Sequence, residues 1–312
     1  MSCQFLYSAY GMKIASDIPL FLPECTDICK EKHIVIAEGE VELSSDLPYH
    51  IGDIRYGYAD LDVLHIHIPW VAAFRIVADS HIQYDPIIGV ADDTIGMYLV
   101  NIVLLFIVRN TMLCMFHGSA VVHTATEQSL VLIGQKGAGK STTATALTRQ
   151  DFALLADDIV PITGTPEVPL VCPGIPVSRL MADALTMLIP EPTYPLCVHD
   201  GLEKYYVPAV CSKQQTPAEL GIMCVLSVVP ALTKYEVHEI CGVEKLRVVL
   251  PHLLHIPGLD TPNELFRSVS SILNKIRVVT IRRPCTPIDR SSLSELEEIL
   301  LQYLADDRGV NA

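Results

Sequence analysis

Val131-Leu-Ile-Gly-Gln-Lys-Gly-Ala-Gly-Lys-Ser-Thr142 is the stretch that decides the fold, because it satisfies the pattern G-x-x-x-x-G-K-[ST]. Its three glycines allow the backbone to turn so that successive N–H groups point inward around a phosphate. A helix that begins near Lys140 adds the positive end of its dipole. Lys140 also offers a mobile cation to the β- and γ-phosphates, and the Ser141 hydroxyl can complete a Mg²⁺ shell.

The flanks of this loop supply the context that the motif requires. A strand-like Leu130–Ile133 precedes it, and a helix-compatible stretch, Ser141–Arg149, follows it. The alternative, a chance glycine turn before a helix, does not account for this order. We therefore predict a site for ATP with Mg²⁺, in which the Thr142 side chain lies near the α-phosphate and the Lys136 side chain is solvated. The residues expected to bind the nucleotide are Gly134, Gln135, Lys136, Gly137, Ala138, Gly139, Lys140, Ser141 and Thr142.

An acidic pair follows the loop at short range. Asp157 and Asp158 come directly after the apolar run Phe152–Ala156, 16 and 17 residues beyond Ser141. A carboxylate at the end of a strand beside the loop strand is where a metal-associated acid is expected. One carboxylate can then orient Mg²⁺ while the other accepts a proton, although the spacing does not say which. The competing interpretation is a strand-end turn with two solvated aspartates.

Composition and charge narrow the class of protein. Half of the 312 residues are apolar and 19% are charged, which is typical of a compact folded chain. The net charge of −14 argues against non-specific binding to nucleic acid or to an anionic membrane surface. Among ten cysteines only Cys25 and Cys29 lie close together, and no second pair completes a zinc site. The first residues do not resemble a secretory signal, so a cytoplasmic protein with reduced thiols is expected.

The segment Ile95–Val108 is almost wholly apolar for 14 positions and then meets Arg109. A membrane-spanning helix needs about 20 such residues, so we expect a buried helix rather than a span. Asp93 and Thr94 are the residues expected to cap its start.

The chain divides by pattern into a β-rich region, residues 1–90, and an α/β domain, residues 91–312. Strand character in the first region is found in Phe5–Ile14, His33–Ala37, Leu61–Ile68 and Ala73–Val77. His65 and His67 share one strand face, where a cross-strand or solvent-facing role is favoured over a metal site because no third ligand is positioned.

The second region mixes strands with helices around the glycine loop. The residues 161–217, dense in Pro and Gly, are expected to be rich in loops. Strands are predicted at Gly118–His123, Ser129–Ile133, Phe152–Ala156, Leu220–Val229 and Arg277–Ile281, and helices at Ser141–Arg149, Val243–His255, Pro262–Leu273 and Leu293–Leu304.

Three features in order resemble the catalytic core of the HPr kinase/phosphorylase family. They are His117-Gly118-Ser119-Ala120-Val121, the glycine-rich loop, and Leu154-Leu-Ala-Asp-Asp158. The opening Tyr7–Pro19, the segment from Phe74 to His117 and Pro173–Leu180 are similar to HPr-kinase-like proteins found with lasso-peptide biosynthesis genes. Members of that branch are understood to phosphorylate a serine, typically the C-terminal one, of a precursor peptide.

The resemblance implies roles for individual residues. It makes Asp157 the base on the acceptor serine, and it pairs Asp158 with His117 near the metal, with Ser141 and Asp158 as metal ligands. The family's E-I-R-G motif has no clear match, and only Arg179 and Asp183 lie in the corresponding stretch. Arg179, Lys204 and the pair Arg282–Arg283 are candidates for contacting phosphate or a peptide carboxylate.

The sequence as a whole predicts an α/β fold: an HPr-kinase-like P-loop core with a mixed sheet, preceded by the β-rich region. The predicted activity is transfer of the γ-phosphoryl group of ATP to a serine hydroxyl of a precursor peptide or small protein. The alternatives are an HPr-like carrier-protein kinase/phosphorylase and a non-catalytic ATP sensor. No nucleic acid or membrane partner is expected, and a homo-oligomer is compatible with the resemblance.

Overall fold

The computed structural model describes residues 4–22, 24–25, 33–175, 177–189, 196–199, 202–208, 216–285 and 290–305. By its internal contacts the chain forms two compact units. The first unit contains Met1–Thr111 and His255–Pro262, and the second contains Met112–Leu254 and Asn263–Ala312. The boundary therefore follows Thr111 rather than residue 90, because the apolar helix that ends there packs within the first unit.

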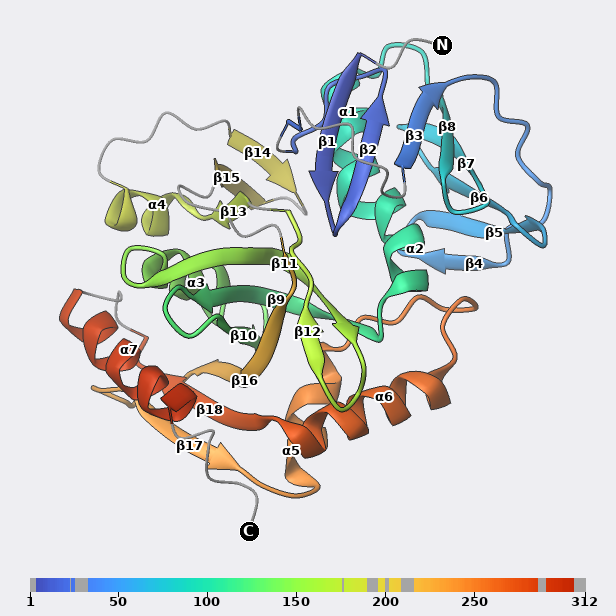
Figure 1. Ribbon diagram of the computed structural model, residues 1–312. Helices are drawn as coiled ribbons and strands as arrows, with labels where there is room; N and C mark the ends of the chain where they lie inside the picture. Colours follow the sequence, from blue (N-terminus) through green and yellow to red (C-terminus); the bar gives the residue numbers. More distant parts are fainter. Residues whose placement is uncertain are drawn as a thin grey trace. The chain divides into compact units, whose positions relative to one another are not determined.

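The first unit is built on an eight-stranded mixed sheet (Figure 1). The strands β2–β3 and β3–β8 are parallel, and the other neighbours are antiparallel. Phe5–Ile14 is two strands rather than one, because Tyr10 and Gly11 turn the chain with positive φ. In spatial order the strands are β1 (Phe5–Ala9), β2 (Met12–Ser16), β3 (His33–Glu38), β8 (His81–Pro86), β7 (Ala72–Val77), β6 (Val63–Ile68), β5 (Ile54–Asp60) and β4 (Tyr49–Ile51).

The predicted strands around residues 33–37, 61–68 and 73–77 are confirmed as β3, β6 and β7. The strands β4, β5 and β8 were not predicted. His65 is buried rather than solvent-facing, and its Nδ1 accepts the backbone N–H of Ser44 at 2.9 Å.

A continuous helix, Asp92–Thr111, covers this sheet within the first unit. It runs through α1 (Asp92–Tyr98), a π-helical turn η1 (Leu99–Val103), α2 (Leu104–Val108) and a 3₁₀ turn η2 (Arg109–Thr111). By length and composition it is a candidate membrane span, but 56% of its apolar window is buried within the protein. The ring of Phe106 packs edge-on against Tyr56 of β5, with 4.9 Å between centroids. The helix therefore fits the expected core helix.

The predicted cap of this helix is wrong. The N-cap residue is Ala91, and no side chain bonds to the helix start. Asp92 and Asp93 instead lie in the first turn, where their negative charge favours the positive end of the helix dipole.

The second unit is built on a seven-stranded mixed sheet. The loop strand β10 runs parallel to β16 and antiparallel to β9, and β16 runs parallel to β18. Since β12 also pairs with β16, the strands β10, β9, β11, β12 and β16 close into a ring. In the order of the sheet the strands are β10 (Gln128–Gly134), β9 (Cys114–His123), β11 (Phe152–Gly164), β12 (Pro169–Val171), β16 (Ala218–Val228), β18 (Arg277–Arg283) and β17 (Glu236–Ile240).

Helices cover both faces of this sheet (Figure 1). One face packs against α3 (Lys140–Leu147) and α7 (Arg290–Ala305), through residues such as Ala144 and Leu300. The other face packs against α5 (Glu244–Val249) and α6 (Pro262–Lys275), through residues such as Val249 and Ile272. The alternation of strands and helices predicted for this region is therefore confirmed as an α/β arrangement.

Two predicted boundaries differ from the structure. The residues 161–217 are less irregular than expected, since their described part contains β12, β13 (Val177–Leu180), α4 (Ala182–Leu188), β14 (Leu196–His199) and β15 (Leu202–Pro208). The predicted helix Val243–His255 is shorter, because α5 passes into a 3₁₀ turn, η3 (Leu250–His252), at Pro251.

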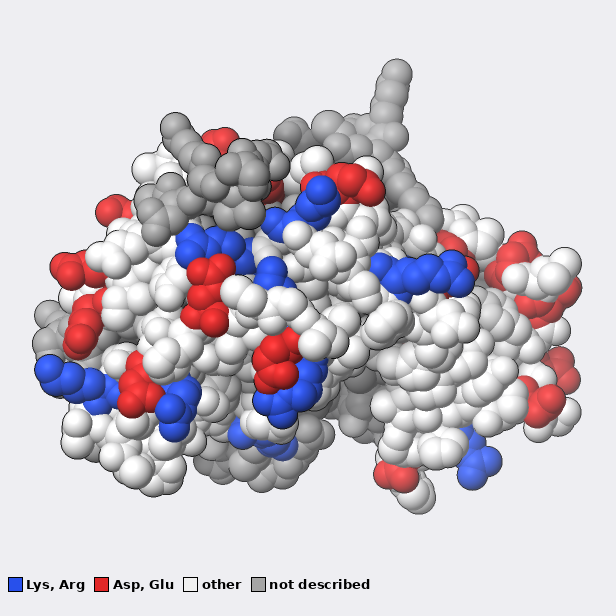
Figure 2. Space-filling view, turned by 90° about the horizontal axis from the view of Figure 1, so that it is seen from below, with Lys and Arg blue, Asp and Glu red and all other residues white. Residues whose placement is uncertain are grey.

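Charged side chains occur in small groups on the surface of the described residues. On the face that Figure 2 presents, acidic and basic groups lie next to one another, with wide uncharged areas between them. The ion pair of Arg282 with Glu236, at 2.6 Å, is one such mixed group on the second unit.

Candidate functional site

The glycine-rich loop joins the end of β10 to the start of α3. Gly134 has a φ of 153°, and a Cβ at this position would lie 2.4 Å from the carbonyl oxygen of Leu226 on β16. Gly139 is the N-cap of α3 and is left-handed, with a φ of 94°. No other residue type fits the first position or adopts the second conformation readily, so the glycines of the motif are required by the turn itself.

Lys140 folds over this loop from the first turn of α3. Its side chain is buried, and Nζ donates to the carbonyl oxygens of Gly134, at 2.9 Å, and Gln135, at 3.3 Å. On the other side of the loop, Arg283 at the end of β18 donates through Nε to the carbonyl oxygen of Ala138 at 2.8 Å. Two cations thus bind carbonyl groups of the loop backbone, while within the loop the N–H of Ala138 donates to the carbonyl oxygen of Gln135 at 3.0 Å.

Asp157 connects the acidic pair directly to the loop helix. Its Oδ1 accepts the Ser141 hydroxyl at 2.9 Å, and its Oδ2 accepts the backbone N–H of Arg179 at 2.9 Å. The side chain is buried, and burial raises the pKa of this carboxyl, although its hydrogen bonds act in the opposite direction. The expected proximity of the acidic pair to Ser141 is therefore present.

The strand that carries the pair differs from the prediction. β11 continues to Gly164 and is next to β9 rather than to the loop strand, so the two aspartates lie within a strand and not at its end. A bulge at Leu155 shifts the register just before them. Asp158 then has a φ of 73°, a conformation that non-glycine residues adopt at a cost. The bulge and this φ turn both neighbouring carboxylates toward partners in the same site.

Ser119 also belongs to the site, although the sequence did not indicate this. It lies opposite Asp157 in the β9–β11 pairing, is fully buried, and donates its hydroxyl to Oδ1 at 2.5 Å. The residue was visible in the His117–Val121 motif, but its partner depends on the register of two strands far apart in sequence.

Replacement of Ser119 with alanine should lower both stability and nucleotide-dependent activity. The buried Asp157 carboxylate loses one of its donors, and we expect the free energy of unfolding to fall by about 1–3 kcal/mol. Urea titration measures this change. Ser129→Ala is the matched control, since Ser129 is equally buried but donates to the neutral carbonyl of Glu219. Equal stability and unchanged activity of Ser119→Ala would contradict a positioning role.

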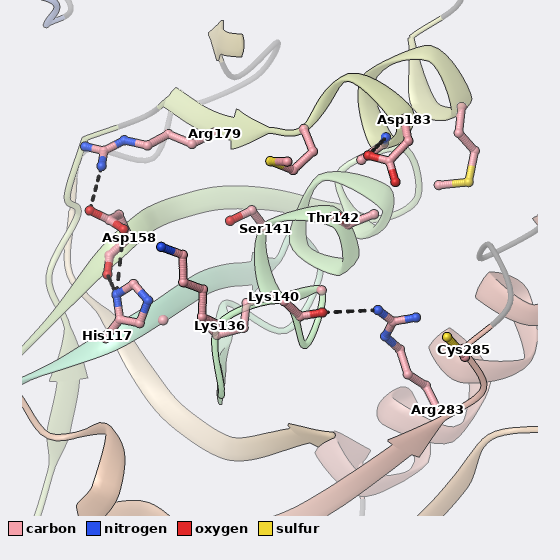
Figure 3. A pocket seen from close by; sticks show the side chains of 16 residues that line it. His117, Lys136, Lys140, Ser141, Thr142, Asp158, Arg179, Asp183, Arg283 and Cys285 are labelled. Atoms are coloured by element: carbon pink, nitrogen blue, oxygen red, sulfur yellow. Dashed lines mark hydrogen bonds and ion pairs between the residues drawn. The ribbon is translucent and has the colours of Figure 1, made fainter. Parts of the chain in front are cut away.

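Asp158 is the more exposed member of the pair and lies between Arg179 and His117. Its Oδ2 forms an ion pair with Nη1 of Arg179 at 2.6 Å, and its Oδ1 lies 3.6 Å from Nδ1 of His117. Figure 3 shows these three residues together at one end of a cavity. Arg179 is buried and pairs with Asp158 within the chain, and its predicted contact with a substrate phosphate or peptide carboxylate stays a prediction.

His117 is oriented by the backbone of the acidic pair. Its Nδ1 lies 3.0 Å from the carbonyl oxygen of Asp158, and because a carbonyl only accepts, Nδ1 carries the proton. Burial lowers the pKa of His117, the charge of Asp158 raises it, and the charge of Lys140 lowers it. These effects together lower the pKa of His117 and so favour the neutral imidazole, with its proton on Nδ1.

The Asp158→Asn variant should lower the pKa of His117 further. The charge of the Asp158 carboxylate is the largest effect that raises this pKa. Its removal leaves only the backbone bond to Asp158 and the charge of Asp157 to act against burial and Lys140. A ¹H NMR titration of the imidazole measures the midpoint, and Asp151→Asn, which removes an exposed carboxylate, should leave it unchanged. An increase in the midpoint of Asp158→Asn would contradict the assigned electrostatics.

A cavity of about 610 Å³ lies over the loop within the second unit. It is lined by Asp158 but not by Asp157. Nine of the other predicted residues also line it: His117, Lys136, Gly137, Gly139, Lys140, Ser141, Thr142, Arg179 and Arg283. The structure adds Asp183, Met181, Met187 and Cys285, which the sequence did not assign to a nucleotide site.

Three residues that were predicted to bind the nucleotide, Gly134, Gln135 and Ala138, do not line this cavity. Lys204 lies in β15, and its side chain lies outside the described residues. Arg282, next to Arg283, forms an ion pair with Glu236 rather than lining the cavity.

His252 is a neighbour of the site that no local pattern indicates. Burial lowers its pKa, and the charges of Lys140 and His117 lower it further. It is brought there by the backbone bond from Leu254 N–H to the carbonyl oxygen of Met115.

The donor set fits a magnesium ion that is shared with phosphates. Among the residues that the structure describes, no group of three or more His, Cys, Asp or Glu side chains forms a metal site. Magnesium, however, is commonly held by one or two protein oxygens and completed by phosphates and water. The Ser141 hydroxyl with the Asp157 carboxylate behind it provides such a pair.

Comparison with known proteins gives distant likenesses among solved structures. The sequence matches no protein-family profile and no curated protein. A search of solved structures finds the Hpr(Ser) kinase/phosphatase from Coxiella burnetii, with 14% sequence identity and a TM-score of 0.33. The match covers 62% of this chain and 93% of that one. At this TM-score the likeness supports no inference about activity, which is argued instead from the geometry of this chain.

Proposed function

We propose that this chain is an ATP-dependent kinase that transfers the γ-phosphoryl group to a serine hydroxyl. The acceptor that the sequence resemblance implies is the C-terminal serine of a lasso precursor peptide. The observation that carries the proposal is the hydrogen bond from Ser141 to Asp157, at 2.9 Å, beside a cavity lined by Asp158. A phosphate-binding loop alone needs no such acids, whereas phosphoryl transfer uses one carboxylate at the metal and one at the acceptor.

The residues of the loop would bind and orient the triphosphate. The backbone N–H groups between Gly134 and Lys140 surround the phosphates, and the Lys140 ammonium leaves its loop carbonyls to meet the β- and γ-oxygens. When bound with ATP, Mg²⁺ neutralises charge on the phosphate oxygens. The residues that would lie next to the metal are Ser141, whose hydroxyl is bonded to Asp157, and Asp157 itself.

In the transfer step the acceptor oxygen forms a bond to the γ-phosphorus while the bond from that phosphorus to the β–γ bridging oxygen breaks. ADP leaves with the electron pair of that bond. The proton of the serine hydroxyl passes to the carboxylate of Asp158. Arg179 and His117 hold this carboxylate in place, through the 2.6 Å ion pair and the adjacent imidazole.

This division of roles exchanges the two aspartates relative to the family-based expectation. Asp157 is buried and its oxygens already accept from Ser119, Ser141 and the Arg179 backbone. A general base must reach the proton it removes, which favours the residue that lines the cavity. We therefore assign Asp157 to positioning on the metal side and Asp158 to the acceptor proton.

Transfer from [γ-³²P]ATP to a serine-bearing peptide tests the proposal. The acceptors are a peptide with a C-terminal serine, the same peptide ending in alanine, and a folded carrier protein with a surface serine. We expect label on the first only, and mass spectrometry should locate it on the terminal serine. Label on the carrier alone would favour a carrier-protein kinase, and tight ATP binding without transfer to any acceptor would contradict catalysis.

A further inference from the structure

The cavity over the glycine-rich loop continues well beyond the residues that the phosphates need. Figure 3 shows His117, Asp158 and Arg179 at one end, and Asp183, Arg283 and Cys285 at the other, with Ser141 and Thr142 between them. A volume of about 610 Å³ is within the range of sites that enclose a whole small-molecule ligand. The far end therefore requires an occupant of its own.

The direction of the bound triphosphate is set by the loop. Lys140 serves the β- and γ-phosphates, and Thr142, one residue beyond Ser141, is on the α-phosphate side. Asp158 and His117 lie at the γ end, so the chain of phosphates runs from them past Ser141 toward Thr142. In a nucleotide the α-phosphate is attached to the nucleoside, which therefore points at the far end of the cavity.

The chemistry of the far end matches a nucleoside. Met181 and Met187, at the two ends of α4, remain 41% and 38% exposed although they line a hollow, with the small Ala184 between them. Methionine is flexible and polarisable and makes favourable contacts with aromatic rings. The carboxylate of Asp183 accepts a bond from the N–H of Ala184, at 2.8 Å, through one of its two oxygens. It has the capacity to accept a ribose hydroxyl or an exocyclic amine as well.

Arg283 forms the opposite wall and ties it to the phosphate site. It holds the loop carbonyl of Ala138, and a Cβ at Gly139 would approach its guanidinium to 3.1 Å. The planar guanidinium can stack on an aromatic ring while it keeps these bonds. Cys285, two residues further on, is exposed and lines the same end.

We propose that α4 and the end of β18 form the nucleoside subsite of this chain, in which Met181 and Met187 face the base, Asp183 accepts a nucleoside donor and Cys285 lies at the rim. The inference rests on the proposed nucleotide-binding function. It assigns a substrate class, nucleoside triphosphates, as distinct from inorganic polyphosphates, which share only the phosphate chain.

Alkylation of Cys285 by iodoacetamide, followed by mass spectrometry of its peptide, tests the subsite. Cys241 is exposed, does not line the cavity, and serves as the internal control. The full chain with Mg²⁺ is alkylated alone, with saturating ATP, and with saturating tripolyphosphate, and calorimetry confirms that each ligand is bound. We expect ATP to slow alkylation of Cys285 about tenfold. Tripolyphosphate should not change the alkylation rate of Cys285, and neither ligand should change that of Cys241.

The outcomes separate this inference from the function on which it rests. If ATP binds but leaves Cys285 reactive, or if tripolyphosphate protects it equally, the subsite is wrong and the phosphate site stands. If neither ligand binds, both proposals fail.

As a second measurement, Asp183→Ala should weaken the binding of ATP about five- to tenfold and leave the affinity for tripolyphosphate unchanged, with Asp151→Ala as the control. Equal weakening of both ligands would overturn the role of Asp183.

Discussion

Replacement of Lys140 with alanine is expected to reduce phosphoryl transfer by about 10³-fold, because the variant lacks the cation that offsets charge on the β- and γ-phosphates during transfer. Lys140 is buried and within bonding distance of the loop carbonyls, so no bulk cation replaces it there. The measurement is the single-turnover rate of label transfer from [γ-³²P]ATP at saturating peptide.

The control for Lys140→Ala is Lys234→Ala, which removes an exposed lysine from a turn of the same unit. Thermal unfolding of both variants separates lost chemistry from lost structure, because Lys140 also bonds to Gly134 and Gln135. A folded Lys140→Ala variant that transfers phosphate at the wild-type rate would show that the loop is not the donor site.

Asp158→Asn is expected to lower the transfer rate by about 10²–10⁴-fold while ATP affinity remains within a few-fold of wild type. The asparagine keeps the shape of the side chain in the cavity but cannot accept the proton of the acceptor hydroxyl. The rate constant comes from rapid quench, and the affinity from calorimetry without the peptide. Asp151→Asn, an exposed change outside the cavity, controls for the lost charge.

Two further variants distinguish Asp158 from its neighbours. Asp157→Asn should lower stability and ATP affinity together, since the amide nitrogen would face either the hydroxyls of Ser119 and Ser141 or the backbone N–H of Arg179. His117→Asn should retain much of the activity, because its amide can still donate to the carbonyl oxygen of Asp158. If Asp158→Asn is fully active while His117→Asn is inactive, the imidazole and not the carboxylate is the base.

Local parts of the site could be predicted from the sequence. The strand Gln128–Gly134, the loop and the helix Lys140–Leu147 are adjacent in the chain, and their periodicity and glycine spacing specify them. The acidic pair was placed near the loop, and its bond to Ser141 is present. These are features in which neighbouring residues determine one another.

Features that depend on distant pairing could not be predicted. The strand β11 continues through two aspartates because β9 pairs with it along its length, whereas a polar pair alone indicates a strand end. Ser119 meets Asp157 across 38 residues, and Arg179 meets Asp158 across 21. The register of two strands and the return of the chain after Gly174 decide these contacts. The periodicity of apolar residues in the sequence indicates neither of them.

The structure of the chain with Mn²⁺ and a non-hydrolysable ATP analogue tests the central claim most directly. The account predicts the terminal phosphate at the cavity end lined by Asp158 and His117, the metal at Ser141 on the side of Asp157, and the nucleoside against α4. A triphosphate bound in the reverse direction, or one whose terminal phosphate lies far from Asp158, would contradict it.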